Sequence, residues 1–467
     1  MAQFSVDRQS ASVAKMAQEW AIIDALMGGT PTMRAAGESL LPRWPNEEQA
    51  SYDARLKVAT LFPAFMRTVS VMAGKPFSKP LAMSEDTPSQ IVEWSKDIDK
   101  EGVNLHSFAA EMFAEIMATG FAGILVEAPK PITGANGRAP TQREQAEAGI
   151  RPYWVRVKHD RILGGRIRNI GGRAVLTQLR IAECGVEDDG DYGDKEVKQI
   201  RVLTPGAWEI QEQRLVKGQL VWVKVDGGKT GLPFIPFVPL YGVRVASMIG
   251  RPPLLELAYL NVKHWQSQSD QDTILHVARV PILFAKGLGD SAITVGASTA
   301  IRANDSEHAD LYFVEHTGKA IEAGAASLEA LEAQMIQSGA ELLVAKPGGR
   351  TATEDMNDAE ANKCDLQRMA EGYRDQLNLA LYYTSQYSKL PGGGSVTLFN
   401  DYAAGSLSDA SAQLVLLMQQ SGVITKRTLI REQQRRGVLS GEIDPEKEIA
   451  AAGEEGPAPG DDIDDPE

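Results

Sequence analysis

Apolar residues recur at helical spacing through the first 120 residues, which predicts a helical N-terminal part of the chain. The apolar face of the second predicted helix is formed by Leu56, Ala59, Phe62, Met66, Val69 and Ala73. Pro63 interrupts this helix and predicts a kink, because proline removes a backbone hydrogen-bond donor. The expected helices lie at 11–27, 51–73, 86–99 and 104–119.

The spacing of apolar residues changes to period two between about 150 and 243, after a short apolar run at 122–129 that predicts a buried strand. Alternation of apolar and polar side chains is typical of strands with one buried face. Hairpin turns are expected at Gly171-Gly172 and at 226–228, and an acidic loop at 187–194. The segment is therefore predicted to be a β-rich insert.

A polar stretch lies in the middle of the helix expected after Pro252 and Pro253, which suit a first helical turn. The stretch, QSQSDQDT at 266–273, has no apolar residue on any face and must meet water or polar neighbours. This pattern favours a wall of helices around a hydrated channel over an ordinary core. The side chains expected to face that channel are Gln266, Gln268, Ser269 and Asp270.

The remainder of the chain is predicted to be mostly helical. Short strands are expected within 280–325, and Thr351 with Glu354 forms a capping box for a helix that ends near Lys389, about 50 Å in length. The segment VTLFN predicts a further strand. The later elements are a helix at 327–342, helices at 408–420 and 425–436, and an acidic tail at 453–467 that is expected to be disordered.

Composition narrows the function classes. The chain has 467 residues, of which 43% are hydrophobic and 24% charged, and no apolar run reaches the roughly 18 residues of a membrane span. The first residues lack the pattern of a secretory signal, and two distant cysteines give no disulfide framework. The net charge of −14 argues against tight binding of DNA but is compatible with letting DNA slide past.

Catalytic and metal-binding motifs are weak. Gly228-Lys229-Thr230 matches the end of a phosphate-binding loop, but Val223 stands where that motif requires glycine. The six histidines form no HExxH pair, and the acids between Asp97 and Glu101 are typical of a solvated helix end. We therefore expect no catalytic residue, no metal and no cofactor.

A series of stretches, in order, resembles the portal proteins of tailed bacteriophages, in particular a podovirus-type portal subfamily. The resemblance covers roughly 50–400, and its specificity lies in the order and extent of the matching stretches. They include YDARLKVATLFPAFMRTVSVMAGKPFSKP (52–80), GFAGILVEAP (120–129), PFIPFVPLYG (233–242), PPLLELAYLNVKHWQSQSDQDTILHVARVPILF (252–284), LYFVEHTGKAIEAG (311–324) and LEALEAQMIQSGAELL (328–343).

The resemblance implies an α+β portal fold, mainly helical, with a β-rich wing insert, clip strands and long stem and wing helices. The implied layout is a wing at 1–251 with its β-rich part at 150–243, a stem helix at 252–278, a clip at 279–326, a second stem helix at 327–342, a tunnel loop at 343–355, a long wing helix and strand at 356–406, a crown at 407–452 and the acidic tail at 453–467.

The same resemblance implies a non-enzymatic head-tail connector. Portals form rings, here expected to have twelve subunits, at one vertex of the capsid in the virion, after synthesis in the host cytoplasm. The ring is the channel for DNA packaging and genome ejection. Its implied partners are double-stranded DNA, the large terminase, the tail adaptor, and the major capsid and scaffolding proteins. Lys346 and Arg350, on the tunnel loop, are expected to approach DNA phosphates.

Two other classes of protein remain open at the level of sequence. The first is a different head-completion or adaptor protein that packs at the vertex without lining a channel. The second is an enzyme of phage DNA metabolism. A ring with a central hole would support the portal, whereas monomers with nuclease activity would support the enzyme.

Overall fold

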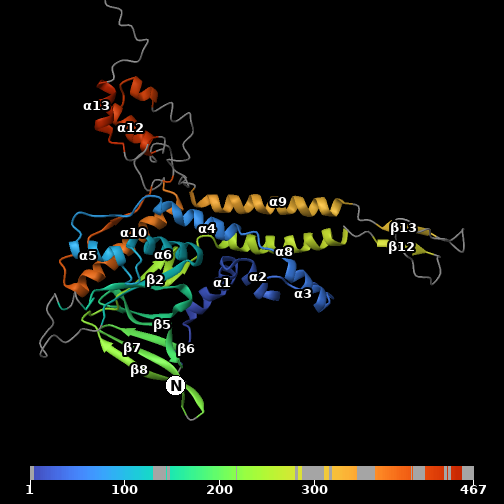
Figure 1. Ribbon diagram of the computed structural model, residues 1–467, viewed down its shortest axis with the longest axis horizontal. Helices are drawn as coiled ribbons and strands as arrows, with labels where there is room; N and C mark the ends of the chain where they lie inside the picture. The colour runs from blue at the N-terminus through green and yellow to red at the C-terminus, as the bar shows by residue number, and fades with distance from the viewer. Residues whose placement is uncertain are drawn as a thin grey trace, which may run out of the picture. The chain divides into compact units, whose positions relative to one another are not determined.

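The computed structural model describes residues 5–129, 144, 148–216, 218–278, 282–286, 310–314, 318–343, 363–400, 402, 416–435, 439 and 443–454. The chain divides into two compact units. The first comprises Met1–Leu342 and Met369–Leu398, and the second Leu343–Arg368 and Phe399–Glu467. Helices and separate antiparallel sheets together confirm the predicted α+β class (Figure 1).

The N-terminal helices follow the predicted positions with one break. The predicted helix at 51–73 is two helices, because the backbone at Ala59 is extended and Pro63 stands immediately before the second one. Asn104 and Gly120 bound the helix predicted at 104–119, Asn104 through its side-chain cap and Gly120 in the left-handed conformation. The helices are α1 (Ala11–Met27), α2 (Gly29–Ala35), α3 (Gln49–Val58), α4 (Ala64–Gly74), α5 (Ser89–Trp94) and α6 (Leu105–Thr119).

A three-stranded sheet forms the centre of the first unit. Its order is β3 (Tyr153–Val157), β2 (Phe121–Glu127) and β9 (Phe237–Tyr241), all antiparallel. The predicted strand at 122–129 is confirmed as β2, which is buried from Phe121 to Val126. Apolar residues of α1 pack with this sheet and with the adjoining larger sheet in one core cluster. It includes Val13, Met16 and Trp20 of α1 and, from the strands, Leu125, Val157, Ile181, Leu203 and Phe237.

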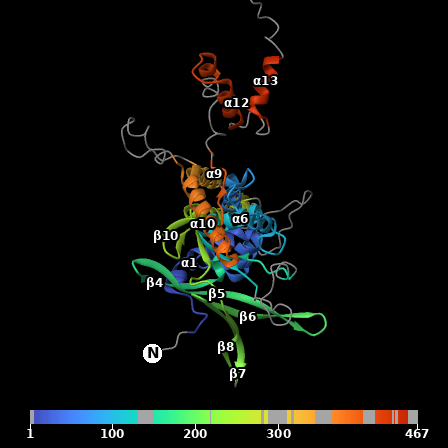
Figure 2. The same cartoon turned by 90° about the vertical axis from the view of Figure 1, so that its left-hand side faces the viewer.

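The β-rich insert is a five-stranded antiparallel meander (Figure 2). Its strands are β4 (Ile162–Ile170), β5 (Arg173–Asp189), β6 (Gly193–Thr204), β7 (Ala207–Val216) and β8 (Gln219–Lys229). Gly171 and Gly172 both have positive φ and form the predicted two-residue turn.

Two turn predictions in this insert are wrong. Residues 226–228 lie inside β8 and pair with β7, because the reversal of the chain is at Gly218, which has the positive φ that the turn requires. Residues 187–194 are the end of the β5–β6 hairpin and not a loop, since cross-strand pairing continues to Asp189 and Gly193.

The other strands of the described residues form three two-stranded sheets. β1 (Ala82–Met83) pairs with β14 (Val396–Thr397), which lies in the predicted strand VTLFN. β10 (Val243–Ala246) pairs with β11 (Ile249–Arg251), and β12 (Ile282–Lys286) with β13 (Asp310–Val314).

Two of the three long helices, α9 and α10, differ from prediction at their starts. α8 (Leu255–Ala278) agrees with it, whereas α9 (Lys319–Ala340) begins well before 327, directly after the left-handed Gly318. α10 (Asp365–Ser388) begins later than 356, since the Gln367 side chain accepts a hydrogen bond from the backbone N–H of Cys364 at 2.9 Å and so caps the first turn. The predicted capping box at Thr351 and Glu354 lies outside the described residues.

The second unit contains α12 (Lys426–Arg435), which confirms the helix predicted at 425–436, and α13 (Pro445–Glu454), which was not predicted. Residues 416–420 are helical, within the helix predicted at 408–420. An ion pair of 3.0 Å joins Arg427 to Glu446, and so α12 to α13. The first two residues of the predicted tail belong to α13, and 455–467 lie outside the described residues.

Candidate functional site

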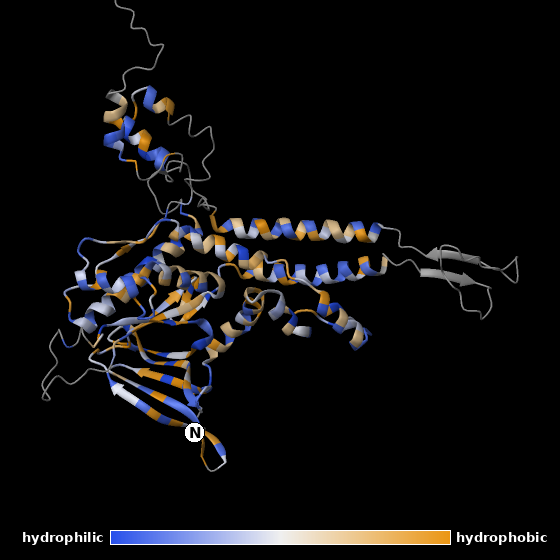
Figure 3. Cartoon of the chain, viewed as in Figure 1, coloured by the Kyte–Doolittle hydropathy of each residue, from blue (hydrophilic) through white to orange (hydrophobic). Residues whose placement is uncertain are grey.

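α8 and α9 lie side by side as an antiparallel hairpin, and the paired strands β12 and β13 stand between them in the chain (Figure 1). The antiparallel direction of α8 and α9 follows from two contacts. The Gln271 amide donates to the carbonyl of Ile321 at 3.0 Å, and His264 Nε2 lies 3.4 Å from a carboxylate oxygen of Glu332. Both helices carry polar and apolar residues along their length (Figure 3).

A glycine lets the two helices approach closely. A Cβ placed on Gly324 would lie 2.0 Å from Oε1 of Gln271, whose side chain is buried. The polar middle of α8 is therefore in contact with the backbone of α9, and its amide is satisfied there.

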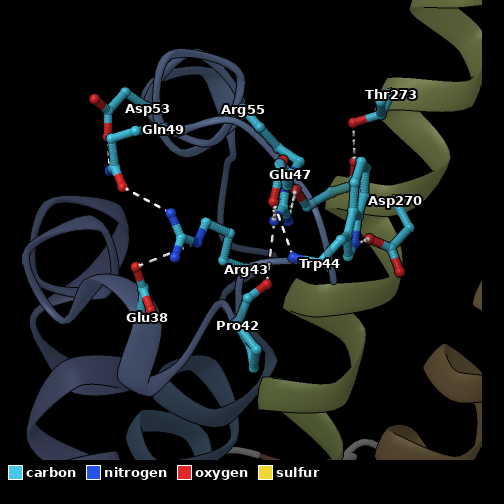
Figure 4. A network of polar contacts seen from close by, with 11 residues as sticks. Glu38, Pro42, Arg43, Trp44, Glu47, Gln49, Asp53, Arg55, Asp270 and Thr273 are labelled. Atoms are coloured by element: carbon cyan, nitrogen blue, oxygen red, sulfur yellow. Dashed lines mark hydrogen bonds and ion pairs between the residues drawn. The ribbon is translucent and has the colours of Figure 1, made fainter.

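Arg55 of α3 binds the opposite side of α8 (Figure 4). Its guanidinium forms two bonds to the Glu47 carboxylate, of 2.8 and 2.9 Å, and lies 3.4 Å from the Ser269 hydroxyl. Its Cζ lies 4.2 Å from the centre of the Trp44 ring, within range of a cation–π contact. The hydrogen bond from Arg55 lowers the pKa of Glu47, against the opposing effect of burial.

The four side chains predicted to face a channel are separated by this arrangement. Ser269 is 2% exposed and lies against Arg55, and Gln266 donates to the carbonyl of Leu40 at 3.0 Å. Gln268 bonds to Asp272 of its own helix. Asp270 is exposed and accepts a bond of 3.2 Å from the indole N–H of Trp44. The polar stretch meets polar neighbours rather than water at Ser269, because residues 38–55 pack against it.

A stripe of exposed side chains runs along α8 at the spacing of one helical face. It combines both charges with an aromatic ring, and Tyr259 is 46% exposed. The stripe consists of Glu256, Tyr259, Lys263 and Asp270. Lys346 and Arg350, the other predicted site residues, lie outside the described residues.

Sequence patterns gave no sign of two clusters of charged side chains. His159 lies 2.6 Å from Glu115 and 3.1 Å from Asp24. Burial lowers the pKa of His159, but hydrogen bonds to Asp24 and Glu115 outweigh it and raise the pKa to about 9. The second cluster joins Arg201 to Glu127 and Glu183. These residues come from different strands and helices, so no local spacing could reveal them.

Asp99 corrects the prediction of a solvated helix end. It is 7% exposed, and one of its carboxylate oxygens accepts hydrogen bonds from the backbone N–H groups of Glu101 and Val103. Arg156 pairs with its other oxygen at 2.6 Å. Asp99 therefore stabilises a turn, which is a structural role.

The described residues contain no group of three or more histidine, cysteine, aspartate or glutamate side chains that could hold a metal ion. None of the helices in the described ranges is long and apolar enough to cross a membrane.

A family model described as a domain of unknown function, DUF4055, matches residues 253–388. The match begins just before α8 and ends with the last residue of α10, so it includes the whole α8–α9 hairpin. No curated protein matches the chain.

Among solved structures, a chain of the virion of a native gene transfer agent particle is similar at 13% identity and a TM-score of 0.39, over 86% of this chain and 97% of that one. A chain from the neck of the empty particle, computed with C6 symmetry, has the same identity and TM-score over 88% and 95%. A chain from the neck of the native particle, computed with C12 symmetry, is 12% identical with a TM-score of 0.36 over 87% and 99%.

Proposed function

We propose that this chain is a portal subunit of a tailed-phage-like particle, without enzymatic activity. The observation that carries the proposal is the antiparallel α8–α9 hairpin, which has a polar interior contact and a β-hairpin, β12–β13, between its helices. This is the order of stem helix, clip and stem helix that the sequence resemblance implies. The part of the chain before α8 would then be the wing.

In this proposal the exposed stripe of α8 faces the channel. Asp270 belongs to the stripe, and Gln266 lies next to it on the helix. Ser269 is excluded by its burial against Arg55. Gln268 is excluded because two residues along a helix turn a side chain by about 200° from Asp270. A stripe of mixed charge suits DNA that must slide past, since no long row of cations holds its phosphates.

The ring would contain twelve copies and form the channel for packaging and ejection at the capsid vertex of the virion. The clip would bind the large terminase and later the tail adaptor, and the outer surface would meet the major capsid and scaffolding proteins.

Electron microscopy of the purified full chain tests the proposal. We expect rings with a central hole. A protein that stays monomeric and cuts DNA would support an enzyme of DNA metabolism, and assemblies without a hole would support another head-completion protein.

The tunnel loop at 343–355 is proposed to bring Lys346 and Arg350 to the DNA phosphates. Their charges stand out in an acidic chain, and a few screened contacts per subunit can break and reform as DNA moves. Lys346→Ala with Arg350→Ala should leave ring assembly intact and reduce DNA packaging in a salt-dependent way. The matched control is Lys57→Ala with Lys158→Ala, two exposed lysines of the first unit. Unchanged packaging at every salt concentration would contradict the contact and leave the ring proposal untouched.

A further inference from the structure

A basic hollow of about 890 Å³ lies between the N-terminal segment and one face of the five-stranded sheet. Residues from Ser5 to Ala14 line one side, and β4, β5, β7 and β8 line the other. Among the described residues, its lining contains three arginines and no carboxylate. The principal side chains are Arg8, Arg166, Arg180, Gln178, Gln211 and Trp222.

Two of these arginines repel one another. Arg166 of β4 is paired in register with Gln178 of β5, and Arg180 follows two residues later on the same face of that strand. Burial, and then the charge of Arg166, lower the pKa of Arg180, while Asp7 opposes them. No ion pair among the residues that the structure describes involves Arg166 or Arg180. Arg180 donates a hydrogen bond to the carbonyl of Val6, and Asp7 lies near enough to act on it, but neither cancels the charge of Arg166. Like charges at neighbouring positions of a sheet are unfavourable, so a further anion would be favoured in the hollow.

An acidic finger projects from the same sheet. Pairing of β5 with β4 stops at Ile181, and pairing of β6 with β7 stops at Gln199, so the residues between them form a free two-stranded ribbon. Near its end Asp188 stands directly opposite Asp194, which is again a pair of like charges. Tyr192 at the turn is fully exposed, and exposed aromatic side chains are typical anchors of interfaces.

The finger of one molecule cannot fill its own hollow. Arg180 and Asp189 lie on the same strand, β5, nine residues apart, which corresponds to about 30 Å of extended chain. An extended strand cannot fold back on itself, so a finger that fills such a hollow has to belong to a different molecule.

We infer that the tip of the β5–β6 ribbon of one copy of this chain, residues 187–194, docks in the arginine hollow of a second copy. The carboxylates of the tip relieve the repulsion between the arginines of the hollow, and the arginines relieve the repulsion between the carboxylates. Carboxylates and guanidinium groups also form strong, directional hydrogen bonds. The contact is head-to-tail, so it repeats from copy to copy and can close into a ring. The inference adds a subunit contact to the proposed function. Only the closure of the copies into a ring rests on that function; the contact itself does not.

The phosphates of DNA are a less suitable occupant. The net charge of the chain is −14, and the acidic ribbon belongs to the same sheet as the hollow, so a long polyanion would meet repulsion there. The hollow is also a local depression bounded by the N-terminal segment, which suits a narrow protein finger better than a duplex.

Complementation between two variants of the full chain tests the inference. The tip variant carries Asp188→Asn, Asp189→Asn and Asp191→Asn, and the hollow variant carries Arg166→Gln and Arg180→Gln. Sedimentation velocity at low and high salt measures self-association, and circular dichroism checks that each variant is folded. Each variant alone should associate roughly tenfold more weakly than the unchanged chain. A mixture of the two should form a 1:1 dimer and nothing larger, because one intact tip then meets one intact hollow.

Control variants neutralise pairs of other exposed charges. They are Glu85→Gln with Asp86→Asn for the tip, and Lys57→Gln with Lys158→Gln for the hollow, and both should associate as the unchanged chain does. Self-association that is unaffected in the tip and hollow variants would overturn the inference. So would loss of binding to a short DNA duplex in the hollow variant with self-association intact. Rings that persist in both variants would refute this contact while the portal proposal stands. Salt-sensitive dimers without rings would support the contact and refute the portal proposal.

Discussion

The guanidinium of Arg55 joins the polar middle of α8 to the segment 38–55. Its side chain is 4% exposed, as is that of its partner Glu47. If either charge were removed, water could not take its place beside the other. Arg43, a short distance away, pairs with Glu38 at 3.9 Å and is well exposed (Figure 4). The two arginines therefore give a matched comparison of a buried and an exposed ion pair.

We predict that Arg55→Met lowers the free energy of unfolding by about 3–5 kcal/mol, because it leaves the Glu47 carboxylate buried and unpaired. Arg43→Met should cost less than about 1 kcal/mol, as is usual for an exposed pair. Urea denaturation of the two variants measures both values. Equal losses would show that burial does not decide the strength of the Arg55 contact.

His159 makes the stability of the chain depend on pH. Its pKa is raised from 6.5 to about 9, so the contribution of His159 to stability is complete below about pH 6.5 and is lost as the pH rises through 9. The side chain is 9% exposed, which limits screening by solvent. We predict that the advantage of the unchanged chain over His159→Gln falls by about 3 kcal/mol between about pH 6 and about pH 10.

Denaturation of both proteins across that pH range measures the difference. An advantage that is constant with pH would mean that His159 is bound to Asp24 and Glu115 without a change in its proton affinity. NMR titration of the imidazole gives the pKa independently.

At the scale of elements, the end of α6 and the entry to α8 are held against one another by Gly120. This glycine ends α6 with φ of 77°, and a Cβ on it would lie 2.2 Å from the backbone of Arg251 and Pro252. The residues that lead into α8 therefore pack directly on the end of α6. Only glycine fits this position, both for its φ and for the space available.

We predict that Gly120→Ala lowers the free energy of unfolding by at least about 3 kcal/mol, from backbone strain together with the steric clash. Gly74→Ala is the control, because Gly74 lies in α4 with no atom within 4 Å of the added Cβ. That substitution should raise the free energy of unfolding by about 0.5–1 kcal/mol, since alanine favours the helix and reduces the entropy of the unfolded chain. Thermal melting compares the two, and a loss in both variants would contradict this account.

At the scale of the whole chain, the first unit contains every described sheet, the helices α8 and α9, and all of α10 except its first turn. Its last segment, Met369–Leu398, supplies most of α10 and the strand β14, which pairs with β1. Within it, the Tyr373 hydroxyl donates to the carbonyl of Ala109 at 2.8 Å from a fully buried position. The C-terminal residues after Leu398 belong to the second unit.

We predict that a chain ending at Leu398 folds with a melting temperature within about 3 °C of that of the full chain, because the buried contacts of the first unit are all retained. Circular dichroism and thermal melting test this outcome. A shorter chain that ends at Met369 is the control, and it should fail to fold because it lacks α10 and β14. Failure of both chains would show that the first unit depends on the second.

The sequence determined the local elements of this chain. Helical spacing placed α1 and α6, Pro252 and Pro253 marked the start of α8, an apolar run placed β2, and Gly171-Gly172 placed a turn, because these features depend on neighbouring residues. The α+β class was implied by the resemblance to portal proteins, and the helical and period-two patterns agree with it. The break at Ala59, the late start of α10 and the pairing of 226–228 within β8 did not follow, since each depends on contacts or backbone angles that no local pattern specifies.

The tertiary structure alone decided the surroundings of the polar residues. The stretch 266–273 looked free of partners in the sequence, yet Ser269 is buried because Arg55, more than two hundred residues earlier, lies against it. The cluster of His159, Asp24 and Glu115 is likewise assembled from distant segments. A pattern of residues states which side chains need a polar partner, whereas only the folded chain decides whether that partner is water, another segment or a second molecule.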